Sequence, residues 1–86
     1  MTEPLLTFPV DFPIKIVGVN EQGFAQAIVD IVRAHCPDYN PAEMTMRPSK
    51  ENRYLSLTLT PRLDSREQLD LLYRALHAHP LARFVL

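Results

Sequence analysis

Residues 54–60 constrain the fold more than any other segment, because they fit a strand with two unlike faces. Their sequence is YLSLTLT, in which Leu55, Leu57 and Leu59 alternate with tyrosine and hydroxyl side chains. Successive side chains of a strand point to opposite sides of its sheet. The segment therefore predicts a strand that buries its leucines against a core. The side chains expected on its other face are Tyr54, Ser56, Thr58 and Thr60.

The segments before this strand predict a strand, a helix and another strand. Residues 12–19 are rich in β-branched residues and predict a strand, and Asn20 is placed to cap the helix that follows. Pro37 ends this helix, because a proline disfavours helical geometry in the residue before it. Residues 42–47 alternate in polarity and predict a second strand, which a hairpin loop joins to residues 54–60.

The rest of the chain predicts a second helix and a last strand. Pro61 stops the strand at residues 54–60, and Asp64 or Ser65 is placed to cap the next helix. Pro80 ends that helix, and residues 82–86 predict a short final strand. The side chains expected on the inner faces of the helices are Phe24, Ile28, Ile31, Val32 and His35 on the first and Leu69, Leu72, Tyr73 and Leu76 on the second.

This order of elements predicts an α+β fold, the ferredoxin-like βαββαβ sandwich. Right-handed crossovers turn the order into a four-stranded antiparallel sheet with two helices on one face. A chain of 86 residues is long enough for one domain at most. We expect residues 8–86 to form that domain and residues 1–7 to form a flexible leader.

Since both helices cover the same face of the sheet, nothing in the chain is expected to cover the other. Alternation places hydroxyl and basic side chains on this open face, which either stays solvated or binds a partner. The partner could be another protein, a small effector or a second copy of the chain in a homodimer. The candidate binding residues are Lys15, Thr45, Arg47, Tyr54, Ser56, Thr58, Thr60 and Arg83.

Composition argues against several classes of partner and compartment. Lysine and arginine number 9 against 10 acidic residues, so a net charge of −1 gives no long-range attraction to nucleic acid or to an anionic membrane. No apolar stretch approaches the length of a membrane span, and prolines interrupt the N-terminal apolar run as they would not in a signal peptide. Cys36 is the single cysteine, so no disulfide can form within the chain, which suits a reducing cytoplasm.

No residue pattern indicates an enzyme, a metal site or a cofactor. His35, His77 and His79 lack companions at the spacing of zinc ligands. Cys36 follows His35 directly, but neighbouring side chains on a helix point apart, and no third residue is placed to orient the histidine. We therefore expect Cys36 to be a structural thiol and the protein to be no enzyme.

Two other functions are known on this fold and remain as alternatives. An acylphosphatase-like hydrolase would need an arginine in the loop at residues 18–23, where Gly18 and Gly23 imitate the spacing but Glu21 is acidic. An RNA-binding domain would stack bases on aromatic side chains of the first and third strands. Here the third strand offers one aromatic residue, Tyr54, so RNA binding would be weak and would rely on Lys15, Arg47 and Arg83.

Several short motifs together resemble the YbeD-like family of small bacterial proteins of unknown function, the UPF0250 or DUF493 type. They are Phe8-Pro9-x-x-Phe12-x-x-Lys15-x-x-Gly18, His35-x-Pro37 followed by Asp38-Tyr39, Pro48-Ser49, Tyr54-x-Ser56 and Arg83-x-Val85-Leu86. The resemblance covers residues 8–86. The chain departs from the family at Lys50-Glu51-Asn52, often Ser-Lys-Gly, and at Leu55, often histidine.

The resemblance implies an ACT-like version of the ferredoxin fold and a bacterial cytoplasmic setting. ACT-like domains usually pair with a second copy and bind small effectors, and the family offers no catalytic residues to transfer. Its genes often neighbour lipoate-attachment genes, which implies a link to lipoate metabolism. Together with the open sheet face, the resemblance predicts a non-enzymatic regulatory or adaptor module.

Overall fold

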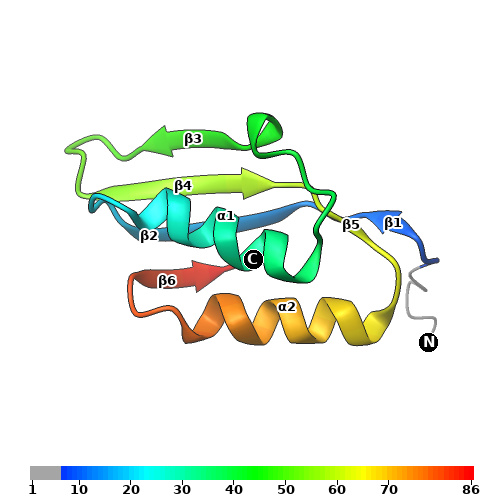
Figure 1. The fold of residues 1–86 in the computed structure, drawn as a ribbon. Coiled ribbons are helices and arrows are strands. Elements are labelled where there is room, and N and C mark those ends of the chain that lie inside the picture. The colour runs from blue at the N-terminus through cyan, green and yellow to red at the C-terminus, as the bar shows by residue number, and fades with distance from the viewer. Residues whose placement is uncertain (1–6) are drawn as a thin grey trace, which may run out of the picture.

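The computed structural model describes residues 7–86 and contains two helices, a four-stranded sheet and a small two-stranded sheet (Figure 1). Of the leader expected at residues 1–7, residues 1–6 lie outside the described part, and Thr7 is exposed. The elements in chain order are β1 (Val10–Asp11), β2 (Ile14–Val19), α1 (Phe24–His35), the 3-10 turn η1 (Pro41–Glu43), β3 (Thr45–Pro48), β4 (Tyr54–Leu59), β5 (Arg62–Leu63), α2 (Arg66–Ala78) and β6 (Ala82–Val85).

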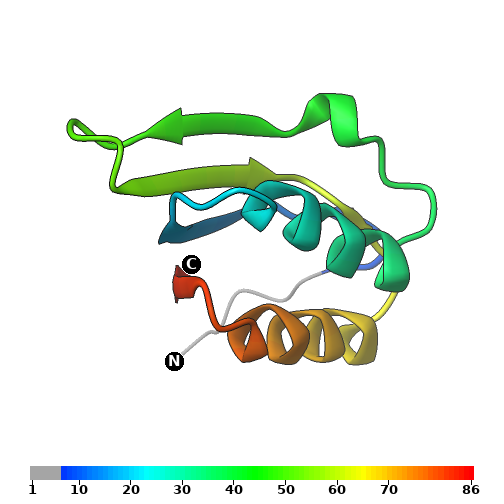
Figure 2. The ribbon, with the colours of Figure 1, turned by 60° about the vertical axis from the view of Figure 1, so that its left-hand side comes forward.

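The larger sheet has the strand order β3-β4-β2-β6, and every neighbouring pair in it is antiparallel. Both α1 and α2 lie on the same side of this sheet, as the two ribbon views agree (Figures 1 and 2). This arrangement confirms the ferredoxin-like βαββαβ fold. One feature was not expected: β1 pairs with β5 in a separate short ribbon, with Val10 opposite Leu63.

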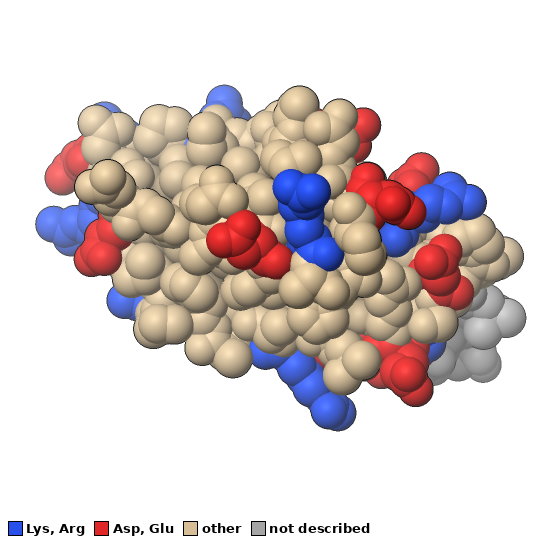
Figure 3. All heavy atoms as spheres, viewed as in Figure 1, with Lys and Arg blue, Asp and Glu red and all other residues tan. Residues whose placement is uncertain are grey.

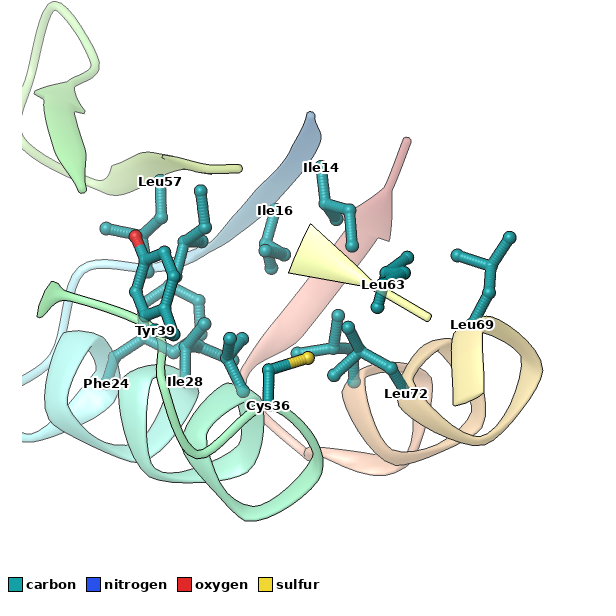
Figure 4. Packing of buried hydrophobic residues seen from close by; sticks show 13 residues of the cluster. Ile14, Ile16, Phe24, Ile28, Cys36, Tyr39, Leu57, Leu63, Leu69 and Leu72 are labelled. Atoms are coloured by element: carbon teal, nitrogen blue, oxygen red, sulfur yellow. The ribbon is translucent and has the colours of Figure 1, made fainter. Parts of the chain in front are cut away.

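The core fills the space between the helices and the sheet. Leu57 and Leu59 of β4 and Ile14 and Ile16 of β2 are almost completely buried, which confirms the predicted phase of the strand at residues 54–60. Figure 4 shows Ile14, Ile16 and Leu57 of the sheet meeting labelled side chains of both helices. The buried helix residues are Phe24, Ile28, Val29 and Val32 of α1 and Leu69, Leu72 and Leu76 of α2.

The start of α1 corrects the prediction that Asn20 caps this helix. Gly23 is the N-cap, in the left-handed conformation at φ 90°, and no side chain caps the helix. Asn20 instead holds the loop before α1 to the β3–β4 hairpin. Its Nδ2 donates to the carbonyl oxygen of Asn52 at 3.0 Å, and its backbone N–H donates to that of Arg53 at 2.9 Å.

Two predicted strands are shorter in the structure. The first begins at Ile14 rather than Phe12, because Pro13 cannot donate to the ladder. The second begins at Thr45 rather than residue 42, since residues 41–43 form the 3-10 turn η1. Met46 of β3 pairs with buried Leu57 but is 58% exposed, because β3 is an edge strand and the helices leave it uncovered.

The N-terminus of α2 agrees with the prediction and joins the two helices. Ser65 is the N-cap, and its Oγ accepts a hydrogen bond from the backbone N–H of Gln68 at 3.1 Å. The side chain of Gln68 accepts from the N–H of Asp64 and donates through Nε2 to the carbonyl oxygen of His35 at 2.7 Å. Gln68 therefore connects the end of α1 to the start of α2.

Candidate functional site

The candidate site is the sheet face opposite the helices, which we call the open face. Two cross-strand rows bring the predicted residues together there. Lys15 of β2 and Thr45 of β3 both pair with Thr58 of β4. In the next row of the same face, Val17 and Arg47 both pair with Ser56. Because paired residues of antiparallel strands point to the same side, these side chains share one surface.

The strand β6 adds two side chains to the open face, Phe84 through its pairing with Val17 and Arg83 through a β-bulge. Phe84 pairs with Val17 and Ala82 pairs with Gly18, so Arg83 is an extra residue between two consecutive positions of β2. A bulge of this kind re-aims the side chains next to it. Both Arg83 and Phe84 border the same surface hollow as Val17. The Nη1 atom of Arg83 donates to the carbonyl oxygen of Pro80 at 2.7 Å, which anchors its guanidinium at this edge.

The centre of the open face is apolar, which sequence reasoning missed. A hollow of about 540 Å³ lies between β3 and β6, and its apolar wall includes Val17, Pro48, Tyr54 and Phe84. Phe84 is 63% exposed and Tyr54 40% exposed, which is a large exposure for aromatic side chains. Val17 could have been found from the sequence, since it alternates with Ile16 as Lys15 does. Phe84 was missed because strict alternation turns it to the face opposite Arg83, whereas the bulge at Arg83 leaves both side chains at the same hollow.

Basic side chains flank this apolar centre. Arg47 and Arg83 border the hollow, and Arg47 also borders a neighbouring hollow of about 340 Å³ with Lys15, Thr45 and Thr58. Among the described residues, none that borders either hollow is acidic. The open face is therefore locally positive, although the whole chain carries −1. By contrast, Figure 3 shows acidic and basic side chains interspersed on the helix side of the molecule.

One predicted site residue does not belong to the open face. Thr60 lies beyond the end of β4 at Leu59. It borders a different hollow of about 330 Å³ near Cys36, Tyr39 and Arg62. The alternation that predicted Thr60 holds only while the strand continues, and Pro61 ends it. The remaining predicted residues, Lys15, Thr45, Arg47, Tyr54, Ser56, Thr58 and Arg83, border the two hollows of the open face.

The cysteine and the histidines have structural contacts. Cys36 is 5% exposed, and burial raises the pKa of its thiol, with the nearby Asp64 carboxylate adding to the effect. A thiol that keeps its proton is a poor nucleophile. His35 makes a 3.0 Å hydrogen bond from Nδ1 to the carbonyl oxygen of Ile31, and Nδ1 of His79 accepts from the N–H of Leu81 at 3.2 Å. In residues 7–86, no three histidine, cysteine or acidic side chains group as metal ligands would.

In the loop between β2 and α1, several N–H groups that an anion cradle would need donate hydrogen bonds within the protein. The N–H of Asn20 donates to Arg53, that of Glu21 to Val19 and that of Phe24 to Glu21, all to carbonyl oxygens. Phosphate cradles at helix N-termini depend on N–H groups that point at the ligand. The geometry of this loop therefore does not favour the hydrolase alternative.

Comparison with known proteins finds relatives of nearly the same length. The family model described as "Protein of unknown function (DUF493)" matches residues 3–86. A UPF0250 protein of Bordetella pertussis is 51% identical over 84 residues, which cover 98% of this chain and 92% of that protein. A UPF0250 protein of Nitrosomonas europaea is 46% identical over 84 residues, covering 98% and 97%. A UPF0250 protein of a Janthinobacterium species is 48% identical over 85 residues, covering 99% and 93%.

Neither α1 nor α2, nor any other helix within residues 7–86, has the length and apolarity to cross a membrane.

Proposed function

The chain belongs to the DUF493 family of bacterial proteins of unknown function, and on that premise we propose that it is a non-enzymatic adaptor or regulatory module. It binds a partner protein through the open face. The observation that carries the proposal is the pair of exposed aromatic side chains, Phe84 and Tyr54, around a hollow on the sheet face that the helices leave bare. Exposed apolar surface rimmed by polar residues is typical of interaction sites.

The chemistry of the other candidate sites supports a binding function over an enzymatic one. Cys36 is buried and keeps its proton, and the N–H groups of Asn20, Glu21 and Phe24 donate within the protein. A nucleophile needs an adjacent base, and a phosphate site needs free donors. Inactivity on a panel of phosphoesters and acyl phosphates is expected, and turnover of any of them would revive the hydrolase alternative.

A second copy of the chain suits the edge of β6 better than the open face. Pairing two open faces would bring Lys15, Arg47 and Arg83 of one copy against the same residues of the other, and such like charges repel. The β6 strand lies at the edge of the sheet, and unpaired edges invite pairing. In β6 the N–H of every second residue points away from β2, and Val85 is at such a position. Val85→Pro removes this N–H from the free edge. A homodimer formed through the edge of β6 should therefore become a monomer, which sedimentation experiments measure.

Cytoplasmic location and a link to lipoate metabolism belong to the same proposal. The location rests on the single buried thiol, Cys36, which suits a reducing compartment.

The small effector that the fold suggests is the alternative occupant of the open face. A protein is the better fit, because the two hollows adjoin at Arg47 and Ser56 and together span the sheet.

The test is capture of a partner from lysate of the protein's native cells with matched variants as bait. Arg47→Glu combined with Thr58→Glu should abolish capture of the partner and leave the circular-dichroism spectrum unchanged, since both side chains lie on the surface of the sheet. Arg74→Glu combined with Gln22→Glu makes the same change in charge at exposed positions outside both hollows and should capture as well as the wild type. A partner that both double variants still capture would refute binding through the open face.

A further inference from the structure

We propose that the open face recognises an acidic peptide segment that carries one apolar anchor residue. This inference rests on the proposed function and adds to it the chemistry of the partner. Its two parts come from two features of the face. The acidic character follows from the basic side chains that flank the hollow, and the anchor follows from the aromatic side chains in its centre.

Charge complementarity indicates that the partner segment is negatively charged. Lys15, Arg47 and Arg83 are exposed and come from three strands, β2, β3 and β6. Within residues 7–86, the ion pairs are Arg62 with Asp11 and Arg66 with Asp70, so the three basic groups of the open face keep no carboxylate of their own. Two arginines on opposite sides of one hollow can each form a bidentate pair with a carboxylate.

The apolar centre determines the anchor. Val17 forms the middle of the hollow on β2, while Tyr54 on β4 and Phe84 on β6 stand at its sides. An aromatic or aliphatic side chain seated among them would bury part of the exposed surface of Phe84 and Tyr54. Buried aromatic and arginine contacts dominate the energy of most protein interfaces. The anchor should therefore contribute as much to affinity as the acidic groups.

The dimensions of the face suit an extended peptide. The strands β3 and β6 lie three strand spacings apart, which is about 14 Å. An extended chain covers this distance with about four or five residues. The face has room for an anchor in the larger hollow and an acidic residue near Lys15 and Arg47 in the smaller one.

The same residues argue against RNA as the occupant. Sheet-face RNA binding stacks bases on aromatic side chains in the middle of the central strands. In β2 and β4 the mid-strand positions on the open face are Lys15, Val17, Ser56 and Thr58. The aromatic side chains lie at the start of β4 and on the edge strand β6 instead.

The experiment selects peptides from a random-sequence display library on the immobilised full chain and measures the affinity of a selected synthetic peptide by calorimetry. We expect the selected peptides to be enriched in aspartate and glutamate near one aromatic or aliphatic residue. Arg47→Glu and Phe84→Ser should each weaken the peptide about tenfold or more, as loss of an interface anchor does. The controls Arg74→Glu and Leu71→Ser change an exposed arginine and a 46% exposed leucine on α2 and should leave affinity unchanged.

Each other outcome overturns the inference. Selected peptides that are neutral or basic, or no selected peptide at all, would exclude an acidic segment as the ligand. Equal losses in the test and control variants would place the binding elsewhere. Binding of a random single-stranded RNA pool, steeply weakened by salt and without peptide binding, would identify a nucleic-acid surface instead. Partner capture that depends on Arg47 and Thr58 while the selected peptides are not acidic would leave the proposed function standing and refute this inference alone.

Discussion

At the scale of single residues, Gly18 shows how closely β2 approaches the first helix. A Cβ atom placed on Gly18 would lie 2.6 Å from the carbonyl oxygen of Leu81 and closer still to the ring of Phe24. Phe24 is fully buried in the core and Leu81 contributes backbone, so neither can move away freely. Glycine is therefore required at this position by lack of space.

We predict that Gly18→Ala lowers the free energy of unfolding by about 3 kcal/mol, as overpacking does at its upper range. Gly23 is the matched control, because a Cβ atom there meets nothing within 4 Å but its φ is +90°. Gly23→Ala should lower the free energy by about 1 kcal/mol through backbone strain alone, and Gly23→Asn by less. Urea unfolding followed by circular dichroism measures all three. Equal effects of the two alanine variants would contradict the close approach at Gly18.

Tyr39 has a buried hydroxyl without a hydrogen-bond partner among the described residues. Its side chain is part of the core cluster and the residue is 7% exposed (Figure 4). A buried polar group that makes no hydrogen bond is destabilising. We predict that Tyr39→Phe raises the free energy of unfolding by about 1 kcal/mol.

The control for this prediction is Tyr54→Phe, which removes a hydroxyl from a residue that is 40% exposed. Its unfolding transition in urea should match that of the wild type, because water solvates the hydroxyl in both states. A loss of stability in Tyr39→Phe would show that its hydroxyl makes a favourable interaction after all.

At the scale of elements, Gln68 links the end of α1 to the start of α2 by hydrogen bonds. Its Oε1 accepts from the N–H of Asp64, and its Nε2 donates to the carbonyl oxygen of His35 and approaches the sulfur of Cys36 at 3.5 Å. The first contact belongs to the start of α2, and the others reach the end of α1. One amide side chain thus links segments 33 residues apart in the sequence.

We predict that Gln68→Glu, which has nearly the same shape, lowers the free energy of unfolding by about 2 kcal/mol at neutral pH. The variant keeps the acceptor for Asp64 but turns the donor into a carboxylate that faces the carbonyl oxygen of His35. This contact disfavours the charged form, so the pKa of the introduced carboxyl rises in the folded state. The deficit should therefore shrink as the pH falls through this raised folded pKa, and it should vanish below about 4.3, the ordinary pKa of glutamate, where the carboxyl becomes protonated in both states.

Chemical unfolding at several pH values tests this prediction, with Glu67→Gln as the control. Glu67 is exposed in the first turn of α2 and should contribute only a few tenths of a kcal/mol through the helix dipole. A deficit in Gln68→Glu that does not depend on pH would contradict the proposed contact with His35.

The elements also show which features the sequence could predict. The phase of β4 was predictable because Leu55, Leu57 and Leu59 alternate with polar residues, and burial of one face follows from that pattern alone. The start of α1 was not, because Asn20 is a good helix cap whose side chain forms a tertiary contact with Asn52 instead. No local sequence pattern shows that the β3–β4 hairpin lies beside Asn20 in the folded protein.

The candidate site divides in the same way. Lys15, Arg47 and Ser56 were placed correctly because each follows the alternation of a regular strand. Phe84 was missed because strict alternation puts it on the face opposite Arg83, and the bulge at Arg83, which arises from pairing with β2, brings both side chains to the open face. Thr60 was misplaced because the strand ends one residue earlier. The apolar centre of the open face thus depends on the pairing between strands, and the sequence of a single strand does not show that pairing.

At the scale of the whole molecule, three ionisable side chains make the free energy of unfolding depend on pH in the alkaline range. Burial raises the pKa of Cys36, Tyr39 and Tyr73 above the ordinary values of these groups, and the carboxylates of Asp64 and Glu43 add to the effect at Cys36 and Tyr39 respectively. The side-chain hydrogen bond from Gln68 opposes it at Cys36. In each case the folded protein prefers the protonated form more strongly than the unfolded chain does.

We predict that the free energy of unfolding falls as the pH rises above about 8.5, the ordinary pKa of cysteine, and further above about 10, that of tyrosine. The sign follows from linkage. Above these pH values the unfolded chain loses protons that the folded protein still holds, and this loss stabilises the unfolded chain. The free energy of unfolding therefore falls until the pH passes the raised folded pKa. Thermal unfolding between neutral pH and about pH 11, beyond the ordinary tyrosine pKa, measures the fall. Cys36→Ala should remove its first part and Tyr39→Phe a share of the second, because each variant lacks one of the groups that ionise on unfolding. Parallel curves for the wild type and both variants would show that Cys36 and Tyr39 do not cause the loss of stability at alkaline pH.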